Sequence, residues 1–586
     1  MPKKNVIYGI NGPVVTVKNS TDFSMLEMVY VGTLKLIGEV IGIDDETTTI
    51  QVYEETSGLK PGEPVVGTNS PLSLTLGPGI ISNIFDGIER PLRDIEKSSG
   101  SFISKGSAVS ALDLEKKWDV TVTAKVGDRL NGGEIYASCP ETPSITHYIM
   151  VPPELSGTVS KVMPSGEYCV NDTVVVLTDD NGEEHELTLC QRWPIRNPRP
   201  IAKRLECTIP LITGQRIVDT MFPLAKGGTA AIPGGFGTGK TMTQHQIAKW
   251  CDADIIIYVG CGERGNEMTQ VLDEFGGLID PRTGKKLTDR TVLIANTSNM
   301  PVAAREASIY TGVTLAEYYR DMGYDVAMMA DSTSRWAEAL REISGRLEEM
   351  PAEEGFPAYL PSRLSEFYER AGRVETLNNK QGSVTVIGAV SPQGADFSEP
   401  VTQNTKRFTR CFWALDKSLA YARHYPAINW ISSYSEYDGD LSRYYDEKVT
   451  PGFMKSRTEI IAILREESSL MEIVKLIGAD VLPDDQKLVI ETARVIRVGF
   501  LQQNAFHKDD TYVPLIKQYK MMETILYLYH TGKDLVAQNV PLSKLIDKGM
   551  FEMLVKMKYE VENDHLEKFD DYIKQIDEIA AEIKSV

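Results

Sequence analysis

The sequence predicts a multidomain protein with two β-rich segments, then an α/β domain that contains a phosphate-binding loop, and finally a helical region. Three observations support this fold class. A chain of 586 residues is too long for one hydrophobic core. Its local pattern changes near residue 200 from strands to alternating strands and helices, and near residue 440 to helices alone. A G-x-x-x-x-G-K-T motif stands between a predicted strand and a predicted helix.

The composition, 42% hydrophobic and 25% charged, is typical of a soluble protein. No run of about 18 apolar residues predicts a membrane span, and the N-terminus does not resemble a signal peptide. The net charge of −20 disfavours binding to nucleic acid, where Lys and Arg must neutralise phosphates. Seven cysteines without C-x-x-C pairs predict reduced thiols in a cytosolic protein, and seven histidines without H-E-x-x-H disfavour a zinc site.

Residues 1–75 are predicted to form an N-terminal β-barrel, because short runs of Val, Ile and Thr alternate with turn signals. An open β-meander fits the same pattern. Residues 76–114 are expected to be a linker with a short helix. The strands expected in the barrel are Val14–Val17, Glu39–Ile43 and Thr49–Tyr53.

Residues 115–190 predict a second, separate β-rich module that precedes the P-loop domain. Its expected strands lie at 119–123, 173–177 and 186–189, and its expected hairpin turns at 131–133 and 179–182.

Residues 191–440 predict the P-loop domain, which begins with a proline-rich strap at 192–200. Apolar strands separated by helices indicate a mostly parallel sheet covered on both faces, with ligands at the carboxyl ends of the strands. Residues 441–586 predict a helical domain. Its tail, from Tyr559, has apolar residues at helical spacing and an acidic opposite face, which predicts a solvated amphipathic helix that can also dock on a partner.

The phosphate-binding motif predicts the chemistry of the α/β domain. Its glycines let several backbone N–H groups point at one anion, and the following helix adds its N-terminal dipole. Lys240 is expected to reach the β- and γ-phosphates, and the Thr241 hydroxyl to bind Mg²⁺. The loop consists of Gly234, Gly235, Phe236, Gly237, Thr238, Gly239, Lys240 and Thr241.

Asp331 ends the apolar run 328–330, which is the pattern of the Walker B carboxylate that holds Mg²⁺. The alternative is that Asp331 caps the following helix, since Ser332, Thr333 and Ser334 come next.

Glu263 follows a glycine at the carboxyl end of another predicted strand, where a carboxylate can orient an attacking water. Arg264 is a candidate for binding phosphate or for holding Glu263 in place. A surface Glu–Arg pair is the competing interpretation. Glu267 competes for the role of Glu263, one turn further into the next helix.

Taken together, the P-loop and three further motifs resemble those of rotary ATPases, in particular the catalytic A subunit of V-type and archaeal-type enzymes. The resemblance extends over essentially the whole chain. The three motifs are G-C-G-E-R-G-N-E at 260–267, N-T-S-N-M-P at 296–301 and D-S-T-S-R-W-A at 331–337.

The resemblance implies a RecA-like nucleotide-binding domain, an inserted bulge module at 115–190, and the hydrolytic glutamate at Glu263. It also implies that Tyr425 and Phe506 enclose the adenine, although both would otherwise be interpreted as core aromatics. Many members have Pro or Ala where this chain has Gly235. The glycine is expected to loosen the loop without abolishing nucleotide binding.

The family assembles as an A₃B₃ ring that hydrolyses or makes ATP with Mg²⁺, and the neighbouring B subunit supplies an arginine finger. The resemblance therefore implies a central rotor shaft, peripheral stalks, a membrane sector that moves H⁺ or Na⁺, and a location on the inner face of the cell membrane. Three alternatives are a secretion or flagellar export ATPase, a non-catalytic subunit, and an RNA helicase. The inserted module disfavours the export ATPase. The non-catalytic subunit is disfavoured by the intact Lys240, Glu263 and Asp331, and the RNA helicase by the negative net charge.

Overall fold

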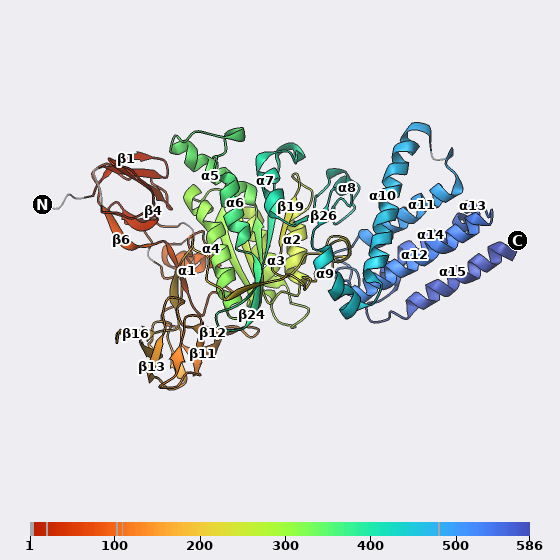
Figure 1. Cartoon of the computed structure of the whole chain (residues 1–586). Helices are drawn as coiled ribbons and strands as arrows, with labels where there is room; N and C mark the ends of the chain where they lie inside the picture. Colours follow the sequence, from red (N-terminus) through yellow and green to blue (C-terminus); the bar gives the residue numbers. More distant parts are fainter. Residues whose placement is uncertain (1–4, 19–21, 101–102, 108, 479–480, 586) are drawn as a thin grey trace. The chain divides into compact units, whose positions relative to one another are not determined.

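The computed structural model describes residues 5–18, 22–100, 103–107, 109–478 and 481–585. The chain divides into two compact units (Figure 1). The first consists of Met1–Leu205, Gly227–Thr229 and Ala253–Phe408. The second consists of Glu206–Lys226, Ala230–Asp252 and Thr409–Val586. Each unit is discontinuous in sequence.

The N-terminal segment of the first unit is a closed barrel of six antiparallel strands in the order β1-β2-β5-β4-β3-β6. Its ends meet where the Ile7 N–H donates to the Glu63 carbonyl and the Val65 N–H to the Asn5 carbonyl, both at 2.9 Å. The prediction of a barrel is therefore confirmed, and the open meander is excluded. The strands are β1 (Ile7–Asn11), β2 (Val14–Lys18), β3 (Glu27–Val31), β4 (Leu36–Ile43), β5 (Thr47–Val52) and β6 (Val65–Pro71).

The second β-rich module contains two four-stranded antiparallel sheets. The predicted hairpin turn at 179–182 joins β15 to β16, as expected. The prediction of a hairpin at 131–133 is wrong, because this turn leads from β10 to β11, which lie in different sheets. A glycine-rich turn permits the chain to reverse, but the buried face of each strand selects its partner. The sheets are β10 (Arg129–Leu130), β13 (Gly157–Val162), β15 (Val175–Thr178) and β16 (Glu184–Leu187), and β12 (Thr146–Met150), β11 (Ile135–Pro140), β9 (Trp118–Val122) and β14 (Gly166–Tyr168).

A parallel sheet forms the centre of the first unit, in the order β24-β22-β20-β21-β8. The segment 76–114, expected to be a linker, supplies its edge strand β8 as well as α1 (Leu92–Ser99). The strap at 192–200 begins within a further strand, β17 (Gln191–Pro194), which pairs with β7 (Ser73–Leu76). The sheet strands are β24 (Gln381–Val390), β22 (Asp325–Asp331), β20 (Ile255–Glu263), β21 (Thr291–Thr297) and β8 (Ile84–Phe85), with β23 (Gly372–Glu375) and β18 (Lys203–Leu205) added antiparallel.

Helix α4 (Val302–Asp321) is buried along nearly its whole length, because it packs between the sheet and the β-rich module. The module contacts it directly where His147 Nε2 lies 2.9 Å from the Tyr318 hydroxyl. One continuous core thus joins the module to the sheet. Because the strands are parallel, their carboxyl ends lie at the same edge of the sheet. The other helices described in this unit are α3 (Gly265–Gly277), η2 (Leu287–Arg290), α5 (Thr333–Arg346), η3 (Glu353–Gly355), α6 (Leu360–Glu369), η4 (Gln393–Ala395) and α7 (Pro400–Phe408).

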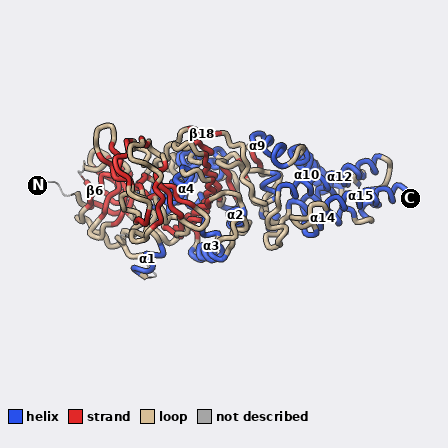
Figure 2. Tube along the Cα trace, turned by 90° about the horizontal axis from the view of Figure 1, so that it is seen from below, coloured by secondary structure: helices blue, strands red, loops and turns tan. Residues whose placement is uncertain are grey.

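The second unit contains β19 (Thr229–Pro233, from Ala230 on), paired in parallel with β25 (Cys411–Phe412), which pairs with β26 (Tyr434–Ser435). From residue 440 on, every described element is helical (Figure 2). None of the described helices combines the length and apolar content needed to cross a bilayer. The helices described in this unit are η1 (Ile217–Met221), α2 (Lys240–Trp250), α8 (Lys417–Tyr421), α9 (Asp438–Tyr444), η5 (Tyr445–Val449), α10 (Phe453–Ile477), α11 (Asp484–Val495), η7 (Ile496–Leu501), α12 (Leu515–Ala537), α13 (Leu542–Asp547), α14 (Met550–Glu560) and α15 (Lys568–Ser585).

The C-terminal tail is amphipathic as predicted, but its helix begins later than Tyr559, which lies in α14. In α15 the apolar residues Phe569 and Ile576 are fully buried. The tail packs on α12, where the Tyr527 hydroxyl donates to Asp577 at 2.6 Å. Its apolar face is therefore covered by the same chain.

Candidate functional site

The P-loop has the strand–loop–helix context that the motif predicts, with β19 before it and α2 after it. Gly239 has a φ of 90°, a left-handed conformation that favours glycine. Lys240 Nζ lies over the loop and donates to the carbonyls of Gly234 at 2.7 Å and Gly235 at 3.2 Å. The Thr238 hydroxyl also donates to Gly235, at 2.8 Å. The ammonium group is thereby held against the loop backbone, close to the N-terminus of α2.

A cavity of about 770 Å³ lies beside the P-loop within the second unit. The P-loop glycines Gly237 and Gly239 line it, together with Tyr425 and Phe506. Tyr425 is 45% exposed and Phe506 is 90% exposed, so neither is a core aromatic. The two residues that the resemblance assigns to the adenine thus line one cavity with the predicted phosphate-binding loop.

The walls of this cavity are tied together by backbone hydrogen bonds. The Gln503 N–H donates to the Tyr425 carbonyl at 2.8 Å. Behind the wall, Lys558 is buried in α14, and its ammonium group donates to the carbonyls of Val498 at 2.7 Å and Gln502 at 3.1 Å. Burial lowers the pKa of Lys558 to about 8, and the positive charge of Arg216 contributes to this shift.

This pKa predicts a pH dependence of stability. The pKa of a lysine in the unfolded chain is about 10.4, so between pH 8 and that value the unfolded chain holds a proton that the folded chain has lost. The contribution of Lys558 to folding stability therefore rises with pH across this window. We expect the melting temperature of Lys558→Met to fall further below that of the wild type at pH 10 than at pH 7.5. Lys556→Met, at an exposed position of the same helix, is the control; parallel melting curves for Lys558→Met would contradict the prediction.

In the first unit, Glu263 is the last residue of β20, and the register with the neighbouring strand shifts just before it. Gly262 has a φ of 75°, and a Cβ there would lie 2.8 Å from the Cβ of Arg335. Glycine is therefore needed at this irregularity of the strand, after which Glu263 again pairs with Thr297 of β21. Its side chain lies partly buried beside two other carboxylates, those of Asp331 and Glu267.

Burial raises the pKa of Glu263 well above its usual range, and the negative charges of Asp331 and Glu267 add to the shift. The positive charge of Arg335 opposes it. A cation bound nearby would favour the ionised form of Glu263, because opposite charges attract. The Asp331 carboxylate is an oxygen donor of the kind that Mg²⁺ prefers.

Asp331 ends β22 beside β20 and is 2% exposed. The Tyr258 hydroxyl donates to its Oδ2 at 3.1 Å. The alternative role as a helix cap is excluded, because the N-cap of α5 is Ser332. Asp331 is thus a buried carboxylate at a strand end, as the Walker B pattern predicts.

Arg264 is the N-cap residue of α3, and its side chain is 65% exposed. Its guanidinium lies 3.9 Å from Glu267, which makes an exposed ion pair with little stabilising energy. Its role toward phosphate stays a prediction.

Sequence reasoning missed two arginines that contact the bend at Gly262. Arg335 comes from the first turn of α5 and pairs with Glu338 at 2.8 Å. Arg305 comes from the first turn of α4 and donates to the Ser298 carbonyl at 3.0 Å. The signal that would have found them is their shared position: each lies in the first turn of a helix that follows a parallel strand, where ligands gather.

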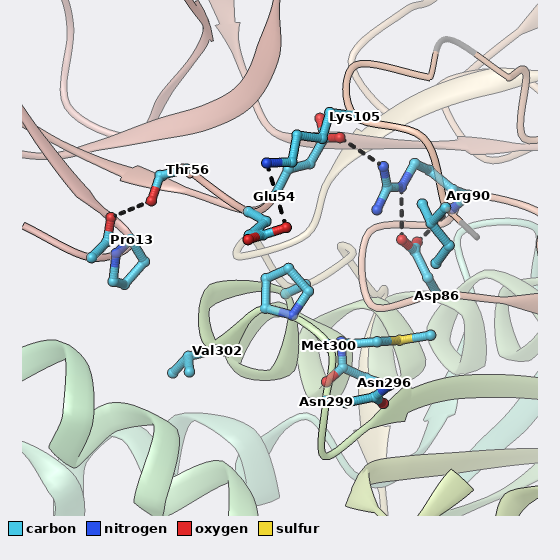
Figure 3. A pocket seen from close by; sticks show the side chains of 15 residues that line it. Pro13, Glu54, Thr56, Asp86, Arg90, Lys105, Asn296, Asn299, Met300 and Val302 are labelled. Atoms are coloured by element: carbon cyan, nitrogen blue, oxygen red, sulfur yellow. Dashed lines mark hydrogen bonds and ion pairs between the residues drawn. The ribbon is translucent and has the colours of Figure 1, made fainter. Parts of the chain in front are cut away.

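A second cavity, of about 530 Å³, lies between the barrel, the segment after β8 and the loop before α4 (Figure 3). Its charged side chains are paired with one another. Arg90 pairs with Asp86 at 2.7 Å and with Glu54 at 3.1 Å, and Lys105 with Glu55 at 3.4 Å. It contains no phosphate-binding loop, so we do not assign the nucleotide to it.

Comparison with known protein families covers most of the chain in four parts. The nucleotide-binding domain of the ATP synthase alpha/beta family matches residues 214–435, and the beta-barrel domain of that family matches 7–69. The ATP synthase alpha/beta subunit barrel-sandwich domain matches 109–196. The C-terminal domain of V and A type ATP synthase matches 442–546. These matches confirm the predicted fold class.

Individual relatives extend the similarity to nearly the whole chain. The V-type ATP synthase alpha chain of Halothermothrix orenii is 60% identical, over 99% of this chain and 98% of the relative. The V-type ATP synthase alpha chain 2 of Clostridium tetani is 61% identical over 97% of both chains. The corresponding A-type ATP synthase chain of Methanopyrus kandleri is 56% identical over 98% of both.

Among solved structures, the assembled ATPase EscN from the type III secretion system of enteropathogenic E. coli has the same fold. The TM-score is 0.63 at 20% identity, covering 89% of this chain and 100% of EscN. At this identity the likeness concerns the fold alone. The identity with the V-type and A-type ATP synthase chains is much higher over their full length, and it confirms the resemblance inferred from the motifs. The chain therefore belongs to the ATP synthase alpha/beta family, as a member of its V-type alpha chains and their A-type counterparts.

Proposed function

We propose that this chain is the catalytic subunit of a rotary, ion-translocating ATP synthase or ATPase. One observation carries the proposal: a complete set of phosphate-binding and acidic motifs occurs in a chain that is 60% identical, over nearly its full length, to a V-type ATP synthase alpha chain. The intact Lys240, Glu263 and Asp331 disfavour a non-catalytic role.

Nucleotide binding is assigned to the second unit. The loop 234–241 cradles the phosphates through its backbone N–H groups, with Lys240 adding a positive charge. The base lies in the cavity between Tyr425 and Phe506, because stacking on aromatic faces recognises a base without a fixed hydrogen-bond pattern.

The Thr241 hydroxyl and the Asp331 carboxylate are the proposed ligands of the Mg²⁺ that accompanies ATP or ADP. When bound, the ion neutralises charge on the phosphate oxygens. Once ionised, the carboxylate of Glu263 orients the attacking water and accepts its proton, and its raised pKa makes it a stronger base. Arg335 favours the ionised form of Glu263, and Arg264 is a further candidate for contact with the phosphate.

The proposed assembly is a ring of three copies of this chain and three non-catalytic B subunits, which supply an arginine finger in trans. A central rotor shaft and peripheral stalks connect the ring to a membrane sector that moves H⁺ or Na⁺, so the chain lies on the inner face of the cell membrane. The net charge of −20 disfavours nucleic acid as a partner.

The function is tested with the membrane complex reconstituted in vesicles. We expect ATP hydrolysis to drive ion uptake, and varying Na⁺ at fixed pH to identify the ion. Hydrolysis that is never accompanied by uptake of either ion, in vesicles that are sealed, would contradict the proposal.

Lys240→Ala is expected to weaken binding of MgATP by about 10- to 100-fold, because a hydrogen bond to a charged group contributes about 1.5–3 kcal/mol. Titration calorimetry on the full chain measures the dissociation constant. Lys249→Ala, at the other end of helix α2, is the control and should bind as the wild type does. Equal affinities of Lys240→Ala and the wild type would exclude Lys240 as a phosphate ligand.

A further inference from the structure

Phe506 has little packing that would hold its ring in place, since 90% of the residue is exposed. It lies in an irregular segment between η7 and α12, residues 502–514, which we call the Phe506 loop. A ring that is to stack on a base must be presented in one position, or its ordering cost reduces the affinity. The position of Phe506 must therefore come from the backbone of the loop.

Arg216 is fully buried, and its hydrogen bonds reach this loop and the end of η7. Its guanidinium donates to the carbonyls of Phe500 and of Gln502, the latter at 2.9 Å. Its backbone N–H donates to the side chain of Gln503 at 2.9 Å. It pairs with Asp510, also fully buried, at 2.5 Å. One side chain thus holds both ends of the turn that contains Phe506.

A chain of hydrogen bonds leads from this ion pair to Phe506. The second oxygen of Asp510 accepts the Asn504 N–H at 2.6 Å. The Asn504 side-chain oxygen accepts the Phe506 N–H at 2.9 Å. Gln503 connects the opposite wall, because its N–H donates to the Tyr425 carbonyl at 2.8 Å. Both aromatic walls of the cavity are therefore linked to Arg216, through the side chains of Asp510, Asn504 and Gln503 and the backbone groups that they bind.

The far end of the loop is attached to the helix that follows the P-loop. In α2, the Trp250 indole N–H donates to the Thr511 hydroxyl at 3.1 Å, and its ring stacks on Tyr512 at 5.3 Å. Tyr512 packs so closely on Gly214 that a Cβ there would lie 2.1 Å from its ring. The loop is thus fixed relative to the same helix whose N-terminus receives the phosphates.

We propose that Arg216 is a positioning residue for the base: through Asp510 and the loop carbonyls it holds Phe506 opposite Tyr425, at a fixed distance from the P-loop. Arg216 does not line the cavity and acts through the loop alone. Its planar fork suits this role, because it donates in several fixed directions at once, which a lysine does not. This inference rests on the proposed nucleotide-binding function.

The test compares MgATP with tripolyphosphate, which offers phosphates but no base, by titration calorimetry on the full chain. Arg216→Lys keeps the charge next to Asp510 but cannot hold both carbonyls. Loss of a stacked base changes affinity by about tenfold or more, so we expect the dissociation constant for MgATP to rise by about tenfold and that for tripolyphosphate to change less than about twofold. Asp510→Asn removes the negative charge of the Arg216–Asp510 ion pair and should have the same effect on the two dissociation constants. It serves as the second variant if Arg216→Lys does not fold.

Arg457→Lys is the matched control. Arg457 is another buried arginine of this unit, and it holds the carbonyls of Thr220 and Met221 rather than the Phe506 loop. The Arg457→Lys variant should bind MgATP and tripolyphosphate with the affinities of the wild type. If Arg216→Lys weakens both ligands equally, or neither, the positioning role is overturned.

The Tyr425→Ala variant distinguishes a wrong positioning role of Arg216 from a wrong assignment of the nucleotide-binding site. If Tyr425→Ala weakens MgATP but Arg216→Lys does not, the base cavity stands and the role of Arg216 is wrong. If Tyr425→Ala binds MgATP as tightly as the wild type, the base does not lie in this cavity, and the inference falls with that assignment.

Discussion

Replacing Glu263 with Gln is expected to stop ATP turnover in the assembled complex while leaving nucleotide binding intact. Glutamine has nearly the same shape but cannot accept a proton from water, and a positioned general base contributes about 10²- to 10⁴-fold to the rate. We therefore expect kcat to fall by about that factor and the dissociation constant for MgATP to change less than about twofold. Steady-state hydrolysis and equilibrium binding measure the two quantities.

The same substitution should not weaken folding. The pKa of Glu263 is raised in the folded chain, so the stability that this group contributes is present at low pH and is lost as the pH rises and it ionises. A neutral glutamine avoids that loss. A loss of activity that is accompanied by a lower melting temperature would therefore indicate misfolding rather than a missing base.

Glu267→Gln is the matched control, because Glu267 lies one turn away in α3 and contributes to the same negative field. We expect it to retain most of the activity. If Glu267→Gln abolishes turnover and Glu263→Gln does not, the two residues exchange roles; if Glu263→Gln hydrolyses ATP at the wild-type rate, Glu263 has no part in the reaction.

The isolated chain is expected to hydrolyse ATP about 10³- to 10⁵-fold more slowly than the assembled ring. An arginine finger supplied by a neighbouring subunit stabilises the charge of the transition state, and its absence costs a factor of that size. The prediction is measured by comparing kcat of the purified chain with kcat after addition of the B subunits under identical conditions.

Replacing the candidate finger of the B subunit with Ala is the control for assembly itself, because the ring should still form while the rate stays low. Comparable turnover with and without B subunits would mean that this chain carries a complete active site, and the proposed division of labour within the ring would be wrong.

Local patterns are sufficient to predict several parts of the molecule. The P-loop is recognisable because its spacing, the strand before it and the helix after it lie within about twenty residues of sequence. Glu263 and Asp331 are recognisable because each ends an apolar strand, and parallel neighbours bring such ends to one edge of a sheet. Propensity and periodicity act over short distances, so they determine features of this kind.

Contacts between distant segments are not predictable in the same way. The edge strand β8 resembles part of a linker in the sequence, because two residues give no periodic signal and its partner β21 lies about 200 residues later. Closure of the barrel and the separation of β10 from β11 likewise depend on which apolar faces become buried together. The importance of Arg335 comes from its proximity to Glu263, and in the sequence only its place in the first turn of a helix after a parallel strand points to it.

By itself, the sequence determined the order of the domains, the phosphate-binding loop and the two acidic strand ends, because each is specified by a few neighbouring residues whose chemistry leaves little choice. Only the tertiary structure decided that Arg216 holds a loop almost 300 residues away and that Phe506 is exposed beside the P-loop. A buried charge must find a partner wherever the fold provides one, and that partner is selected by packing in three dimensions, which no local pattern encodes.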